Sequence, residues 1–203
     1  MKTHLLGPAL MLAYGVIRLY DGLDDRYGPG GAWTIGHLAF LAGLACFVPV
    51  VRDLRRRAAR RPALALGTAA LTLAGAAALA VQFVIDVSVG FASTSRPEMS
   101  SHFQQISGTP GVEPLVYTVV PQFFFVGLVA QLAVLASVRG VAWWSPALAL
   151  AAIVVAATAK DLIPVTAALL GAALPPAASV QVRPRPAESR SSSGPAGHKQ
   201  RHR

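Results

Sequence analysis

Charged side chains are scarce in this sequence. They make up 13% of the 203 residues, while 54% of the residues are hydrophobic; soluble domains typically contain about 25% charged residues. A water-soluble fold of this length could not bury so much apolar surface. We therefore expect a lipid bilayer to surround the apolar segments.

Cysteine and the sequence motifs of common enzymes are also nearly absent. Cys46 is the only cysteine and lies within an apolar run, so the chain can form neither an internal disulfide nor a thiolate metal cluster. The sequence contains no HExxH, GxSxG, GxxxxGK[ST] or CxxC pattern. We predict no cofactor and no metal site, and an enzyme is not the favoured class.

Five long apolar runs contain most of the hydrophobic residues. About 20 apolar residues in a helix cross the roughly 30 Å hydrocarbon core of a bilayer. Alanine, leucine and glycine dominate the runs and no period-two alternation is present, which favours helices over a barrel. The sequence predicts an all-α, polytopic membrane helix bundle, 1–174, with about five transmembrane helices, near residues 5–20, 33–51, 63–91, 115–138 and 142–174.

The fifth run is longer than one span requires. Lys160, Asp161 and Pro164 interrupt it, and a proline removes one backbone donor from a helix. We expect a break there. A hairpin of two spans is the alternative, but 162–174 is too short to cross a bilayer, so one broken helix is favoured.

Arginine placement predicts the orientation, because short cytoplasmic loops are rich in Lys and Arg. The connection after the second run carries one aspartate, Asp53, and six arginines: Arg52, Arg55, Arg56, Arg57, Arg60 and Arg61. We expect this basic loop to be cytoplasmic and to contact anionic lipid headgroups. The N-terminus is then cytoplasmic as well, and five spans place the C-terminus outside.

The C-terminal segment 175–203 is basic and rich in Ser, Pro, Gly and Ala, so we expect a disordered tail. Its charge favours the cytoplasm, which conflicts with five spans. The net charge of +9 is concentrated in the loop and the tail. Neither is a folded basic face with aromatic stacking residues, so nucleic acid is not an expected partner. The sequence indicates no protein partner.

Polar residues inside the apolar runs are the best functional candidates, because an ionisable group in hydrocarbon is costly and usually faces the bundle interior. Most of them lie toward the outer leaflet; Gln131 lies deeper, where an interhelical hydrogen bond is expected. We predict a polar cavity open to the outer face, with Asp86 paired to Arg18 or Lys160. The candidate residues are Arg18, His37, Gln82, Asp86, Gln122, Lys160 and Asp161.

Small residues and one loop complete the sequence-based expectations. Gly67 and Gly75 allow close contact between helices in lipid. The segment 92–114 contains His102 and is expected to be a solvated outer loop, long enough to fold over the cavity.

Three classes of function remain open. The favoured one is a small carrier or permease-like component that binds a charged solute. The second is a membrane-embedded enzyme acting on a lipid or isoprenoid, with Asp86 as proton donor or base. The third is a non-catalytic membrane partner of another protein.

Overall fold

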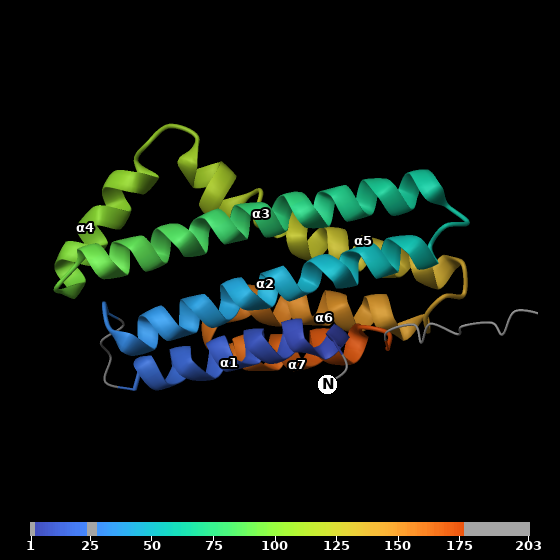
Figure 1. The fold of residues 1–203 in the computed structure, drawn as a ribbon, viewed down its shortest axis with the longest axis horizontal. Helices are drawn as coiled ribbons and strands as arrows, with labels where there is room; N and C mark the ends of the chain where they lie inside the picture. Colours follow the sequence, from blue (N-terminus) through green and yellow to red (C-terminus); the bar gives the residue numbers. More distant parts are fainter. Residues whose placement is uncertain (1–2, 24–27, 177–203) are drawn as a thin grey trace, which may run out of the picture.

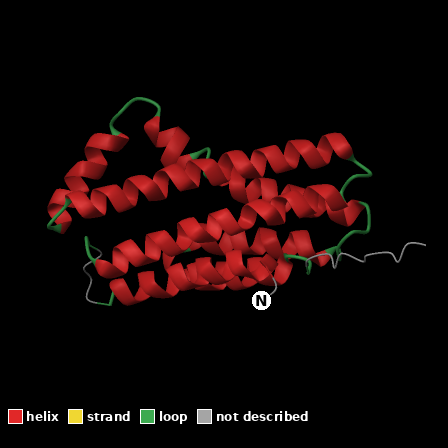
Figure 2. Ribbon diagram, viewed as in Figure 1, coloured by secondary structure: helices red, strands yellow, loops and turns green. Residues whose placement is uncertain are grey.

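The computed structural model describes residues 3–23 and 28–176. All regular secondary structure in this part of the chain is helical (Figure 2), which confirms the predicted all-α class. Seven α-helices are described: α1 (Leu6–Asp21), α2 (Gly31–Arg57), α3 (Pro62–Ala92), α4 (Arg96–Ser107), α5 (Gln122–Ser137), α6 (Trp144–Thr158) and α7 (Ile163–Ala173). Three short helical turns accompany them: η1 (Thr3–Leu5), η2 (Glu113–Thr118) and η3 (Lys160–Leu162).

Three helical segments are long and apolar enough to cross a membrane. They are Gly31–Arg57, Pro62–Ala92 and Glu113–Ser137, which contain 18-residue stretches with mean hydropathies of 2.0, 2.0 and 2.1. These segments contain or closely match the second, third and fourth predicted spans. The first predicted span corresponds to α1, which has 16 residues. The fifth corresponds to two shorter apolar helices, α6 and α7.

The helices form a closed ring (Figure 1). Helix α1 packs against α2, α2 against α3, α3 against α5, α5 against α6, and α6 against α7, while α7 returns to contact α1. Helix α4 packs on α3 outside this ring. The buried apolar side chains form one core shared by the ring helices.

The fifth predicted span is a helical hairpin, so the expectation of one broken helix is wrong. Ser145 at the start of α6 donates a hydrogen bond to the carbonyl oxygen of Ala173 at the end of α7. The chain therefore reverses between the two helices. The break lies where it was expected, at η3, and Pro164 occupies the first turn of α7, where a missing N–H is tolerated.

The reversal brings the end of α7 back to the arginine-rich end of α2. The Nη2 group of Arg57 donates a hydrogen bond of 2.7 Å to the carbonyl oxygen of Pro176 and forms an ion pair of 2.7 Å with Asp53. The chain thus leaves α7 at the same end of the bundle as the arginines that follow the second predicted span. This is contrary to the expectation that the basic loop and the end of the fifth span lie on opposite sides. This removes the conflict between the charges of the two segments. The rest of the predicted tail, from 177, lies outside the described residues.

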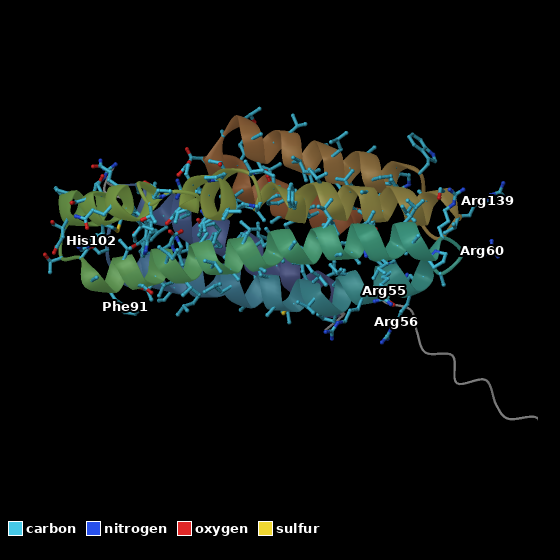
Figure 3. The ribbon with its side chains drawn as sticks, turned by 90° about the horizontal axis from the view of Figure 1, so that it is seen from above. Arg55, Arg56, Arg60, Phe91, His102 and Arg139 are labelled. Atoms are coloured by element: carbon cyan, nitrogen blue, oxygen red, sulfur yellow. The ribbon has the colours of Figure 1, made fainter. Side chains whose placement is uncertain are left out.

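The predicted basic loop is largely helical. Helix α2 continues through Arg57, and only four residues, 58–61, separate it from α3. Cations in the last turn of a helix interact favourably with its dipole. We call Arg52, Arg55, Arg56, Arg57, Arg60, Arg61 and Arg139 the arginine end. Figure 3 shows Arg55, Arg56, Arg60 and Arg139 together at one end of the bundle, and Phe91 and His102 at the other.

Glycines bring α3 and α5 into backbone contact. A Cβ atom on Gly75 would lie 1.9 Å from the backbone nitrogen of Phe124, and one on Gly127 would lie 2.5 Å from that of Thr72. Gly67, which the sequence suggested as a second contact residue, has no such neighbour within 4 Å. Gln131 is fully buried nearby and donates a hydrogen bond of 2.9 Å to the carbonyl oxygen of Val51, as expected of it.

Candidate functional site

A cavity of about 540 Å³ lies inside the ring. All six ring helices contribute to its wall, and so does η2, through Tyr117. Five of the seven candidate residues line it: Arg18 of α1, His37 of α2, Gln82 and Asp86 of α3, and Gln122 of α5.

Among the described side chains, the candidate residue Asp161 does not line the cavity. Asp161 lies in η3 and is exposed. Lys160 begins η3, and only its backbone is described. The hairpin contributes to the wall through residues that the sequence did not single out, including Ile153, Ile163 and Thr166.

His37 and Asp86 meet across the interface of α2 and α3. The Nε2 atom of His37 lies 3.6 Å from Oδ2 of Asp86. His37 is 4% exposed and Asp86 is 8% exposed. The predicted partner of Asp86 was Arg18 or Lys160; the structure adds His37.

A signal for this pair was present in the sequence. His37 follows the first residue of α2 by six positions, and Asp86 precedes the last residue of α3 by six. Adjacent antiparallel helices place residues at equal distances from their neighbouring ends side by side, so this distance alone makes the two residues candidates for contact. The distance along the helix does not show in which direction each side chain points around the helix axis.

Trp33 fixes the relative position of the two helices. The Nδ1 atom of His37 is 2.7 Å from the carbonyl oxygen of Trp33, one turn earlier. The Nε1–H group of Trp33 donates a hydrogen bond of 3.0 Å to the backbone oxygen of Asp86. Gly90 provides space for the indole, because a Cβ atom there would lie 2.7 Å from Cδ1 of Trp33.

Aromatic rings surround the imidazole of His37. The ring centroid of Trp33 lies 4.1 Å from that of His37, Phe83 lies at 5.1 Å, and Tyr14 at 5.5 Å. Phe40 stacks on Phe83 with centroids 4.0 Å apart. Sequence reasoning overlooked these aromatic residues. Their spacing was a usable signal, since residues three or four positions from His37 or Asp86 share its helix face.

The corner between α3 and α4 lies at the end opposite the arginines. Ser93 is buried and hydrogen-bonds to the backbone oxygen of Val89 at 2.8 Å and to Nδ1 of His102 at 3.1 Å. His102 therefore belongs to a helix packed on α3, not to an irregular loop. Backbone and hydroxyl hydrogen bonds from Thr94 to the Glu98 carboxylate lower the pKa of Glu98 below its usual 4.5.

The described side chains include no group of three or more His, Cys, Asp or Glu residues placed to hold a metal ion. No protein-family model matches the chain, and no similar protein was found among curated sequences or solved structures.

Proposed function

We propose that this chain is a multi-pass membrane protein that binds a small solute in the ring cavity, as a carrier or permease-like component. The observation that supports this proposal best is the convergence of Arg18, His37, Gln82, Asp86 and Gln122 on one cavity. Ionisable residues within membrane helices characteristically mark the pathways of solutes and ions.

The cavity has the size and chemistry of a small-molecule site. Its volume of about 540 Å³ lies within the range of about 300–1,000 Å³ usual for such pockets, which combine apolar walls with a few polar groups. Phe40, Phe83 and Phe125 supply aromatic wall. A suitable solute has a small apolar body and one charged or hydrogen-bonding group.

The outer surface of the ring supports a lipid environment. Large apolar side chains are exposed on several helices, including Val16 on α1, Ile35 on α2, Val84 on α3, Val126 on α5 and Val154 on α6. Such a distribution is unusual on a soluble monomer, where large contiguous apolar patches are rare. In a bilayer these side chains face the hydrocarbon.

The orientation follows from the charges. The arginine end is cytoplasmic, where it contacts anionic lipid headgroups. The N-terminus is on the same side, and so is Pro176, whose carbonyl oxygen accepts a hydrogen bond from Arg57. Helix α4 and the mouth of the cavity then belong to the outer side.

The α6–α7 hairpin enters from the cytoplasmic side in this arrangement. Its helices have 15 and 11 residues, which correspond to about 22 Å and 16 Å at 1.5 Å per residue, short of the roughly 30 Å hydrocarbon core. Neither helix of the hairpin is therefore long enough to cross the hydrocarbon core alone.

Labelling of introduced cysteines tests whether water reaches the cavity. Cys46→Ser removes the only native thiol, and Gln82→Cys or Gln122→Cys then places a thiol in the wall. Val84→Cys and Val126→Cys are matched controls on the same helices, because these residues are 54% and 51% exposed on the proposed lipid face. The probe is a charged, membrane-impermeant thiosulfonate applied to intact cells.

We expect labelling at positions 82 and 122 and none at 84 and 126. Two further variants report the orientation: His102→Cys should be labelled in intact cells and Arg60→Cys only after lysis. Protection of positions 82 and 122 equal to that of the controls would overturn the solute-binding proposal. Labelling of Arg60→Cys in intact cells would overturn the orientation.

A further inference from the structure

The geometry points to a proton-binding site: we propose that His37 and Asp86 together bind one proton, which they exchange with water in the cavity. The proposal goes beyond solute binding and does not depend on it. It begins with the hydrogen bonds of the imidazole.

The Nδ1 atom of His37 carries a hydrogen. Its neighbour at 2.7 Å is the carbonyl oxygen of Trp33, and a carbonyl oxygen only accepts hydrogen bonds. In a neutral imidazole with a hydrogen on Nδ1, the Nε2 atom presents a lone pair. This lone pair is on the side of the ring that faces Asp86.

The contact between Nε2 and the carboxylate of Asp86 therefore requires one additional proton, on the imidazole or on the carboxylate. A lone pair and an ionised carboxylate oxygen 3.6 Å apart repel each other in a poorly hydrated interior. A proton on Nε2 produces an imidazolium–carboxylate ion pair, and a proton on Oδ2 produces a carboxyl group facing an acceptor. In either arrangement the proton belongs to the pair and not to one residue.

The aromatic neighbours of His37 favour a proton held on the ring, whereas burial and the positive charge of Arg18 oppose it. Trp33, Phe83 and Tyr14 all lie within 5.5 Å of the imidazole, centroid to centroid. The faces of aromatic rings attract cations, most strongly when the cation is removed from water. Because Trp33 is itself tied to the backbone of Asp86, the ring and the carboxylate are held in register.

The other titratable groups near the pair come from α1 and η2. Arg18 and Tyr14 of α1 and Tyr117 of η2 line the same cavity. Asp21 and Arg18 also line a small adjoining space, beside Trp33 and His37. The described wall residues from α5, α6 and α7 add no titratable side chain.

Protonation changes the charge of the site by one unit. Arg18, His37 and Asp86 sum to zero without the shared proton and to +1 with it. The adjoining space measures about 10 Å³, close to the minimum for one water molecule. Its lining includes both Asp21, at the end of α1, and His37.

Trp33 is a built-in reporter of this proton, because a protonated imidazole quenches a neighbouring indole more strongly than a neutral one. The full chain is reconstituted in lipid nanodiscs with Trp143→Phe and Trp144→Phe, which leaves Trp33 as the only tryptophan. Both replaced residues are exposed and lie outside the cavity wall. Emission is then followed over about pH 4 to 9, a range that covers shifts of a few units around the usual histidine value.

We expect one step in which emission falls as the pH is lowered. His37→Gln should abolish the step. Asp86→Asn should move the midpoint of this step to lower pH by at least one unit, a tenfold loss of proton affinity. The neutral amide does not stabilise the imidazolium as the carboxylate does. Asp86→Glu should restore most of the shift. Circular dichroism and gel filtration establish that each variant is folded.

The proposal is overturned if emission of the single-tryptophan chain does not change with pH, or if the midpoint is the same in the Asp86→Asn variant. Both outcomes can be read without His37→Gln, should that variant not fold. Neither outcome affects thiol labelling of the cavity, so failure here is distinguishable from failure of the solute-binding proposal.

Discussion

The two halves of the bundle are packed in opposite ways. Toward the arginine end, Gly75 and Gly127 bring the backbones of α3 and α5 together, and the fully buried Gln131 joins α5 to α2. Toward the end that carries Phe91 and His102, bulky aromatic side chains stand between the helices, and the cavity opens among them. Glycines close the interface between α3 and α5 in one half, and the other half holds a cavity around a polar pair.

This difference explains how a small membrane protein can hold polar groups without losing its fold. Helix association in lipid depends on close packing and hydrogen bonds, because the lipid removes most of the hydrophobic drive between helices. The closed half supplies the close packing. The open half can then accommodate Arg18, His37 and Asp86, whose burial alone would be unfavourable.

The largest expected effect comes from breaking the closed half. Gly75→Ala would place a Cβ atom 1.9 Å from the Phe124 nitrogen, so α3 and α5 must separate, at a cost of about 3 kcal/mol. Gly67→Ala is the matched control on the same helix, because Gly67 has open space around it. It should be neutral or stabilise by about 0.5 kcal/mol. Unfolding in mixed detergent micelles measures both, and equal stabilities would refute the backbone contact.

A smaller effect is expected in the open half. Gly90→Ala should displace Trp33, since the added Cβ would lie 2.7 Å from Cδ1 and 2.8 Å from Nε1 of the indole. We expect a loss of about 1–2 kcal/mol and a red shift of Trp33 emission in the single-tryptophan chain. The indole can tilt into the cavity, which is why the cost is lower than at Gly75. Unchanged emission would show that Trp33 does not rest on α3.

The smallest effect concerns the corner beyond the cavity and depends on pH. Because the pKa of Glu98 is lowered in the folded protein, its contribution is present above the unfolded value of 4.5 and is lost as the pH falls through the folded value. The protection factors of amides at the start of α4, which correct for the intrinsic pH dependence of exchange, should therefore fall as the pH drops below 4.5. Glu98→Ala should show the lower protection at neutral pH already. Protection factors that do not change with pH in the parent chain would argue against this role of Glu98.

The sequence predicted the all-α class and the three long apolar helices, because these depend on length and hydropathy alone. It did not predict the hairpin. The short segment 162–174 was rejected as a span, but a helix that packs on α6 and α1 need not cross the whole bilayer. The side reached by the chain after α7 was misjudged for the same reason.

The contact between Asp86 and His37 was not predicted. Arg18, His37 and Asp86 lie at similar positions along their helices, but which of these side chains meet depends on how each helix is rotated about its axis. That rotation follows from contacts such as Gly75 with Phe124 and Gly90 with Trp33, which no pattern of hydropathy reveals. Asp161 illustrates the same point, because it lies at a break in the fifth run and yet is exposed.

A double-mutant cycle on His37 and Asp86 tests most directly whether the open half is organised around this pair. The free energies of unfolding of His37→Gln, Asp86→Asn and the double variant are compared with that of the parent chain at neutral pH. Contacting charged residues show coupling energies of about 0.5–3 kcal/mol, and we predict at least about 1 kcal/mol here. Effects that add to within about 0.3 kcal/mol would contradict the account.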